Sequence, residues 1–297
     1  MKKDLILGTS WGYSIDKISP FVLSWKKYCS DSTNLYLVVN PNINKETAEF
    51  LQDNGAVLKS FFAAHFIPDT LNLTRYLKYF DILSEQKGKH GGILITDVRD
   101  VIFQANPFNE ETRKGLHFFY EDESILIGPD AFGNSCMDYN YGPEIVNELW
   151  DERVICSGTT MGDQTSILRY LYTLISQRNL AKMMEVVPMI GSYMFENPPV
   201  DQAMHQYIYY KKLVDATMHE NGDIVSTIAQ TPEEKIFVDE NNFIHLDEYV
   251  SPIVHQWDRH RNLTDLIVQM YNVNDKEEDL SYIEKGHFVL GKREKSE

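Results

Sequence analysis

The chain has 297 residues, of which 43% are hydrophobic and 12% aromatic, enough to bury a substantial core in one large α/β domain or two small ones. It carries 44 acidic residues against 28 lysines and arginines, and the formal charge of −16 excludes an extended surface for a phosphate backbone, so we expect no nucleic-acid partner. A small anionic ligand is still compatible with this charge, because a divalent cation can supply positive charge locally.

Strand-like and helix-like patterns alternate through the first half of the chain. Apolar runs typical of strands occupy positions 4–7, 35–39, 57–62, 93–96 and 124–127. Apolar residues recur at helical spacing around 18–25, from about 72 to 86, and after Asp163, which is a candidate N-cap residue. This alternation predicts an α/β fold with a mixed, mostly parallel sheet flanked by helices.

The second half of the chain is less regular. We expect short strands at 184–187, 224–228, 236–239 and 243–246, and a helix around 202–213. The segment 133–143, rich in Gly, Asn and Tyr, predicts a loop, and residues 291–297 predict a polar tail. The sequence therefore indicates a single domain over about residues 1–290.

The first residues lack the apolar core of a signal peptide, and no later run reaches the length of a membrane span. We therefore expect a cytoplasmic protein with no membrane span. The three cysteines, Cys29, Cys136 and Cys156, are widely spaced and outside any Cys-x-x-Cys pattern, which predicts free thiols.

Two carboxylates, Asp97 and Asp100, follow the apolar run at 93–96. A central strand of an α/β sheet delivers its last residues to the edge where ligands bind. In a straight strand the two side chains point to opposite faces, but a turn brings residues i and i+3 within about 7 Å, so that both can address one Mg²⁺ or Mn²⁺ ion. The alternatives are a proton-transfer pair and a structural knot in which Arg99 neutralises the acids.

A histidine, His255, follows a second short β-like run, and Gln256, Asp258 and Arg259 come directly after it. Its imidazole can add a nitrogen ligand to an ion that carboxylates already hold. The alternative is a structural histidine held by hydrogen bonds. The polar residues around it favour a site.

The segment ILITDVRDVIFQANPF resembles the strand and acidic motif of metal-dependent nucleotide-sugar glycosyltransferases of the GT-A fold. The further segments that are similar to this family are, in chain order, TSWGYS, LTRYLKYFDIL, ICSGTTMG, PPVDQAMHQ and IVHQWDRH. The resemblance extends over about residues 5–260 and implies a nucleotide-binding half at about 1–130 and an acceptor and metal half at about 131–262.

The resemblance implies transfer of a sugar from a UDP- or GDP-sugar to a glycan or another acceptor, with Mn²⁺ or Mg²⁺ as cofactor. Asp97, Asp100 and His255 would hold the ion. Asp201 and Gln202 match the Asp-Gln motif of retaining members, so they are the catalytic candidates and retention is favoured. Asp201 also stands where a helix N-cap residue is expected.

The resemblance also implies donor-binding residues in the first loop, where Thr9, Trp11 and Tyr13 would border the nucleotide. Either aromatic ring can stack on a base, and partial burial in the core is the alternative. Arg75, on the helix before the acidic motif, would orient an active-site carboxylate, touch the diphosphate, or form a surface ion pair.

Three further positions complete the expected donor site. Arg99 either pairs with an acid or approaches the diphosphate. Ser157 offers a hydroxyl and Gly158 allows close approach to the sugar, with a simple tight turn as the alternative.

One departure from the family concerns the spacing of the acids, which are usually separated by a single residue, whereas Val98 and Arg99 intervene here. Either both acids bind the ion through a tighter turn, or Asp100 binds it while Asp97 contacts the ribose.

Two other functions compete with sugar transfer. A haloacid-dehalogenase-type phosphatase also has a strand ending in Asp-x-Asp, but that motif is normally close to the amino terminus. A non-catalytic sugar-nucleotide or glycan-binding protein of the same fold is compatible with the irregular spacing, because a fold does not determine a function.

Overall fold

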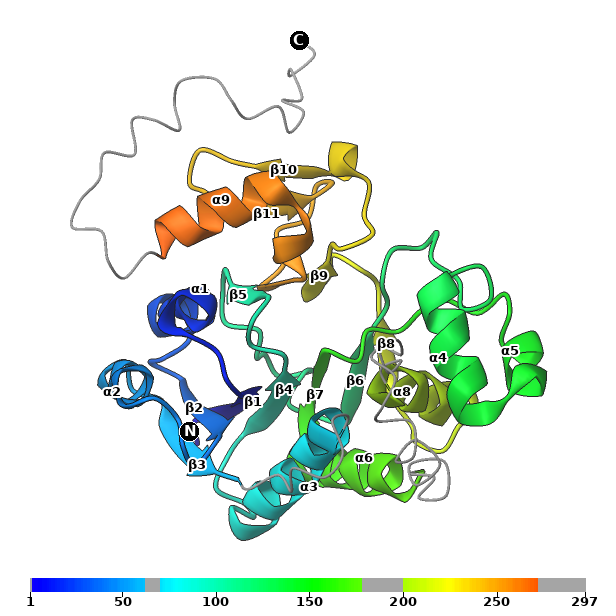
Figure 1. The fold of residues 1–297 in the computed structure, drawn as a ribbon, viewed down its shortest axis with the longest axis horizontal. Coiled ribbons are helices and arrows are strands. Elements are labelled where there is room, and N and C mark those ends of the chain that lie inside the picture. The colour runs from blue at the N-terminus through cyan, green and yellow to red at the C-terminus, as the bar shows by residue number, and fades with distance from the viewer. Residues whose placement is uncertain (1, 62–69, 178–199, 272–297) are drawn as a thin grey trace, which may run out of the picture.

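The computed structural model describes residues 2–61, 70–177 and 200–271. Its centre is a seven-stranded sheet in the order β3-β2-β1-β4-β7-β6-β8 (Figure 1). β7 runs antiparallel to both of its neighbours, and the other neighbouring pairs are parallel, which confirms the predicted mixed, mostly parallel sheet. The strands are β1 (Asp4–Ser10), β2 (Thr33–Val39), β3 (Val57–Ser60), β4 (Gly92–Thr96), β6 (Leu116–Phe119), β7 (Thr159–Asp163) and β8 (Thr217–His219).

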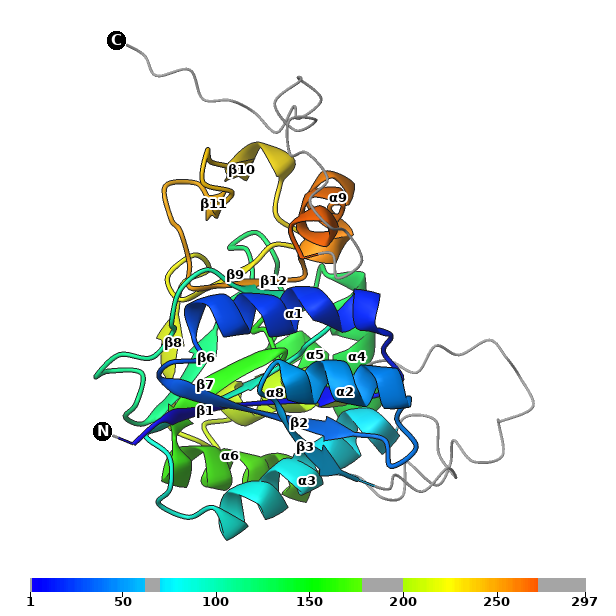
Figure 2. The same cartoon turned by 90° about the vertical axis from the view of Figure 1, so that its left-hand side faces the viewer.

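Helices cover both faces of this sheet, with α1 and α2 on one side and α3 and α6 on the other (Figure 2). Strand β4 has apolar side chains on both faces, and each face is covered by helices. Because successive side chains alternate, Leu94 packs in the core with α1, whereas Ile93 and Ile95 pack in the core with α3 and α6. The helices are α1 (Ile15–Tyr28), α2 (Lys45–Asp53), α3 (Thr70–Glu85), α4 (Ala131–Tyr141), α5 (Pro143–Glu148), α6 (Gln164–Ser176) and α8 (Val200–Tyr210).

A smaller unit lies against the α1 side of the central sheet (Figures 1 and 2). It contains a three-stranded sheet of β5 (Val101–Phe103), β12 (Ile253–His255) and β9 (Val225–Thr227). A hairpin of β10 (Ile236–Val238) and β11 (Ile244–Leu246) packs with the short helices η2 (Glu233–Lys235) and η3 (Trp257–Arg259) and with α9 (Arg261–Met270). β5 follows β4 closely in the chain and pairs with β12. The end of β12 therefore lies near the end of β4, at the edge of the central sheet.

Two sequence predictions of local structure are wrong. The expected strand at 124–127 is a turn with an isolated bridge at Leu126, because Asp122 accepts hydrogen bonds from the backbone and side chain of Ser124. The expected loop at 133–143 is α4, which Asp130 caps through the Gly133 amide and whose apolar residues pack into a local core. Tertiary packing outweighs the low helix propensity of Gly and Asn there.

The other predicted elements agree with the structure. Asp163 caps α6 by accepting from the amides of Thr165 and Ser166, and the strands expected at 224–228, 236–239 and 243–246 are β9, β10 and β11. The strand expected at 184–187 and the polar tail expected at 291–297 lie outside the described residues. The three cysteines are free and buried. None of the helices in the described ranges is long and apolar enough to cross a membrane.

Candidate metal centre

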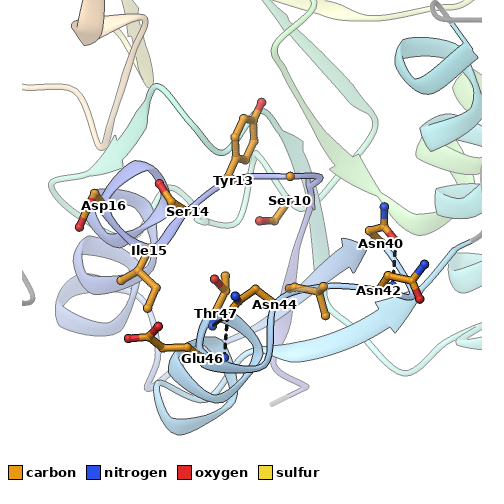
Figure 3. A pocket seen from close by; sticks show the side chains of 12 residues that line it. Ser10, Tyr13, Ser14, Ile15, Asp16, Asn40, Asn42, Asn44, Glu46 and Thr47 are labelled. Carbon is orange, nitrogen blue, oxygen red and sulfur yellow. Dashed lines mark hydrogen bonds between the residues drawn. The ribbon is translucent and has the colours of Figure 1, made fainter.

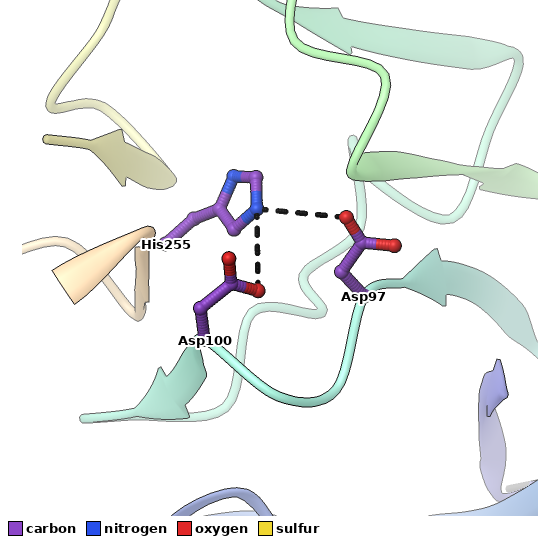
Figure 4. A group of neighbouring side chains, drawn as sticks. All are labelled: Asp97, Asp100 and His255. Carbon is purple, nitrogen blue, oxygen red and sulfur yellow. Dashed lines mark ion pairs between the residues drawn. The ribbon is translucent and has the colours of Figure 1, made fainter. Parts of the chain in front are cut away.

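Asp97 and Asp100 stand at the two ends of the short connection between β4 and β5. The chain leaves the central sheet after Thr96, and the amide of Asp97 donates to the carbonyl oxygen of Gly158 at 2.8 Å. The connection curves so that both carboxylates face one space (Figure 4). The turn that the first of the two alternatives requires, in which both acids address one ion, is therefore present.

His255, the last residue of β12, faces the same space (Figure 4). It pairs with Val101 across the antiparallel β5–β12 ladder, and the Gln256 amide donates to the Asp100 carbonyl oxygen at 2.7 Å. The His255 Nε2 atom lies 3.8 Å from Asp97 Oδ2 and 3.9 Å from Asp100 Oδ1. The prediction that these three side chains lie together is confirmed.

The three side chains fit a divalent cation. One ligand atom from each lies within 4.8 Å of the other two. Ligands bonded to one Mg²⁺ or Mn²⁺ ion at about 2.1 Å lie roughly 3 to 4.2 Å apart, which matches the histidine–carboxylate distances. His255 is 1% exposed, and its Nε2 atom has no hydrogen-bond partner in the described chain. A buried, unpaired nitrogen aimed at two carboxylates is well suited to coordinate a metal ion.

Each carboxylate uses one oxygen for an arginine and presents the other to His255. Arg75 Nη1 donates to Asp97 Oδ1 at 2.6 Å, and Arg99 Nη2 donates to Asp100 Oδ2 at 3.0 Å. The oxygens that face His255 are Asp97 Oδ2 and Asp100 Oδ1. The arginines therefore fix the orientation of both acids without occupying the oxygens available to an ion.

The charges of the centre influence one another. Burial opposes ionisation of Asp97, but Arg75 and His255 outweigh it and hold the pKa of this carboxyl well below its usual range. Burial also disfavours the charged form of His255, yet Cys156 and the carboxylates of Asp97 and Asp100 hold its pKa well above the ordinary value. A bound cation would take the place of the proton on His255.

Arg75 joins the centre to Asp201, the acid of the Asp-Gln pair. Its Nη2 atom donates to Asp201 Oδ2 at 2.8 Å, and the Tyr76 hydroxyl donates to the same oxygen at 3.4 Å. The Arg75 side chain is only 13% exposed, so the alternative of a surface ion pair is wrong. Burial raises the pKa of Asp201, and Arg75 limits the rise.

Gln202 bonds Ser157, the neighbour of Gly158, which lies against His255 and Asp97. Gln202 Oε1 accepts hydrogen bonds from the amide and the hydroxyl of Ser157 at 3.1 and 2.6 Å. A Cβ atom on Gly158 would lie 2.4 Å from the His255 ring and 2.9 Å from Asp97 Oδ2. Only glycine fits at this position, so Gly158 is required for close packing against the two ligands.

A cavity of about 520 Å³ opens beside β1, between the amino ends of α1 and α2 (Figure 3). Tyr13 lines it, and burial together with the charge of Asp97 raises the Tyr13 pKa, which places this residue within the electrostatic reach of the metal centre. Thr9 is buried, with its hydroxyl bonded to the Tyr79 hydroxyl at 2.6 Å, and Trp11 is half-buried. Of the three expected nucleotide contacts, Tyr13 alone lines this cavity.

Several residues of the site were not among the predicted ones. Cys156 Sγ contacts His255 Nδ1 at 3.1 Å, and Arg259 Nη2 lies 3.7 Å from Asp100 Oδ2. Ser10, at the end of β1, is 2% exposed and its hydroxyl has no hydrogen-bond partner among the described residues. Arg259 stood in the polar run after His255, and Ser10 and Cys156 stood in the segments TSWGYS and ICSGTTMG, but neither was assigned a role.

A comparison with models of protein families finds no match to this chain, and a comparison with curated proteins finds none either.

Proposed function

We propose that this protein is a GT-A-type glycosyltransferase that uses Mn²⁺ or Mg²⁺ and moves a sugar from a UDP- or GDP-sugar to a glycan or a similar acceptor. One observation carries the proposal. Asp97 and Asp100 are each held by an arginine through one oxygen, and each turns its other oxygen toward the unpaired Nε2 of His255. Oxygen ligands with one imidazole nitrogen suit Mn²⁺ and Mg²⁺.

The location of the centre supports a nucleotide ligand. Ligands of open α/β sheets bind outside the carboxyl ends of the strands, where β1 and β4 deliver Ser10 and Asp97. The cavity beside β1 has room for a nucleoside, and burial raises the pKa of Tyr13, which lines it and is close enough to Asp97 and Asp100 for their charges to raise that pKa further. A nucleoside in the cavity would carry its diphosphate toward Asp97 and Asp100.

The residues of the chain would act as follows. Asp97, Asp100 and His255 hold the cation, which when bound acts as a Lewis acid toward the departing nucleoside diphosphate. Arg99 is paired with Asp100 but remains 38% exposed, so its free N–H groups can donate to a phosphate.

Asp201 is the carboxylate that we assign to the sugar side of the donor. Its negative charge there stabilises the positive charge that develops at the anomeric carbon. Arg75 couples Asp201 to Asp97, so one guanidinium links the sugar side to the metal side. A carboxylate at this position favours transfer with retention of configuration.

A donor screen tests the proposal. We expect a UDP- or GDP-sugar to lose its sugar slowly to water, or rapidly to an acceptor, only when Mn²⁺ or Mg²⁺ is present. Asp100→Asn should abolish this activity, whereas Asp215→Asn, at an exposed carboxylate on another part of the surface, should not. Nucleotide binding without turnover of any donor would instead indicate a binding protein of the same fold, and phosphate release from simple esters would indicate a phosphatase.

A further inference from the structure

The amino end of α8 is linked to the metal centre through two separate sets of hydrogen bonds. Asp201 is linked to Asp97 through Arg75, with hydrogen bonds of 2.8 and 2.6 Å. The next residue, Gln202, bonds the segment between Ile155 and Gly158, and Gly158 in turn accepts from the Asp97 amide. Two consecutive residues of one helix are therefore each linked to the centre by a different route.

Three hydrogen bonds hold the side chain of Gln202. Its Oε1 atom accepts from the Ser157 hydroxyl at 2.6 Å and from the Ser157 amide at 3.1 Å. Its Nε2 atom donates to the Ile155 carbonyl oxygen at 2.8 Å, and the residue is 8% exposed. An amide oxygen that accepts two hydrogen bonds has no lone pair left to direct at a sugar.

The segment that Gln202 holds determines how two of the metal ligands are oriented. The Gly158 carbonyl oxygen accepts from the Asp97 amide at 2.8 Å, and the Gly158 Cα approaches the His255 ring so closely that no Cβ fits. Cys156 Sγ contacts His255 Nδ1 at 3.1 Å, which leaves Nε2 directed at the carboxylates. A shift of this segment would move Asp97 and His255 together.

We propose that Gln202 is a positioning residue of the metal centre, with an amide oxygen that is committed to Ser157. It fixes the 155–158 segment, and through that segment it fixes Asp97 Oδ2 and His255 Nε2 at the spacing that a cation requires. This inference rests on the metal site of the proposed function. It departs from the expectation, drawn from the family resemblance, that Gln202 belongs to the catalytic pair.

The test measures Mn²⁺ binding directly, by the loss of the free-ion electron paramagnetic resonance signal, in the full-length protein without any donor. Gln202→Met keeps the length of the side chain and removes all three hydrogen bonds. Loss of a group that orients metal ligands typically weakens metal binding about 10- to 100-fold, and we expect a weakening in this range. Gln202→Glu keeps an acceptor for Ser157 and should lose less.

Gln206→Met is the matched control. Gln206 is fully buried one turn further along α8, and neither of its amide atoms has a hydrogen-bond partner in the described chain. The same chemical change there should leave Mn²⁺ affinity unchanged. Where sugar transfer is measured, a high Mn²⁺ concentration should restore the rate of Gln202→Met, because a positioning defect is a defect in ion binding.

Two results would overturn the inference and are distinguishable from failure of the proposed function. Unchanged Mn²⁺ affinity in folded Gln202→Met, with a lower kcat that Mn²⁺ does not restore, would make Gln202 a catalytic residue. Absence of Mn²⁺ binding in the unsubstituted protein would contradict the proposed function itself. If Gln202→Met does not fold, Ser157→Ala removes the 2.6 Å bond from the other side and should weaken Mn²⁺ binding in the same direction.

Discussion

The metal centre and the cavity beside β1 lie at the same edge of the central sheet, yet the chain builds them differently. Asp97 and Asp100 lie three residues apart and His255 comes from a distant part of the sequence, and Arg75 and Arg99 hold the two carboxylates. The cavity is lined by two short segments, 10–16 and 40–47, and many of its residues are exposed. Charge is concentrated in the first region, whereas hydroxyl and amide groups predominate in the second.

This difference predicts how each region responds to substitution. Removing one partner of a buried ion pair leaves an uncompensated charge in a medium of low dielectric constant, so changes at the centre should affect both folding and cation binding. Removing a hydroxyl that has no partner breaks no bond, so changes in the cavity should affect ligand binding alone.

Arg75→Met should have the largest effect, because it removes the guanidinium that pairs with both Asp97 and Asp201. Breaking a buried pair costs roughly 3–5 kcal/mol, and we expect a loss of this size in the free energy of unfolding measured with denaturant. Arg259→Met, at a side chain that is 45% exposed, is the control and should cost less than about 1 kcal/mol. Similar losses at the two positions would contradict the contrast between buried and exposed charge.

The buried carboxyl group of Glu121 should make the free energy of unfolding depend on pH. Burial raises its pKa to about 7 from 4.5, a rise that His255 reduces and Asp130 increases. The folded protein therefore binds the proton more tightly than the unfolded chain, and the free energy of unfolding should fall as pH rises from about 4.5 to about 7, by roughly 3 kcal/mol in total.

Glu121→Gln removes this titration. We expect the variant to match the unsubstituted protein near pH 4.5 and to be more stable above pH 7, in chemical denaturation with a chelator present. Glu123→Gln, at a carboxylate that is 80% exposed, should leave the pH dependence unchanged. Equal pH slopes for Glu121→Gln and the unsubstituted protein would show that Glu121 is ionised in the folded state.

Gly158→Ala should impair cation binding more than folding. The added Cβ would lie 2.4 Å from the His255 ring and 2.9 Å from Asp97 Oδ2, so both ligands must move. Displaced ligands should weaken Mn²⁺ binding about 10- to 100-fold, measured by calorimetric titration. Retention of full Mn²⁺ affinity in this variant would mean that the ion does not lie between Asp97 and His255.

Ser10→Ala should have the smallest effect and should be confined to the cavity. The Ser10 hydroxyl points toward Asn44 and Thr47 at the start of α2 (Figure 3), and it has no partner among the described residues. We expect unchanged stability and Mn²⁺ affinity, because the buried hydroxyl makes no hydrogen bond to a described residue that the substitution could break, and a loss of nucleotide affinity of no more than about 1 kcal/mol. A loss of Mn²⁺ affinity here would show that cavity and centre are not separate.

The three candidate metal ligands could be predicted from the sequence because each follows a short apolar run. Asp97 and Asp100 after one strand, and His255 at the end of another, place charge where a sheet ends. The turn between the acids was one of two alternatives that their spacing left open. The β5–β12 ladder brings the end of β12, with His255, to the end of β4, with Asp97. This ladder is a long-range pairing that no local pattern specifies.

The supporting contacts could not be predicted, because they depend on which side chains face each other across the fold. The Arg75 helix had been recognised, but not that one guanidinium bridges Asp97 and Asp201. Cys156 gave no signal, since a cysteine beside a histidine ring is indistinguishable in sequence from an ordinary core thiol. The helix α4 was missed for a similar reason, because packing and not propensity stabilises it.

A thermal-shift measurement tests the central claim most directly. The protein is heated alone, with Mn²⁺, with UDP or GDP, and with both together. Because a ligand that binds only the folded state raises the melting temperature, a cation that bridges Asp97, Asp100 and His255 to a diphosphate should make the combined rise larger than the sum of the separate rises. An equal rise for the nucleotide with and without Mn²⁺ would contradict the metal-bridged site.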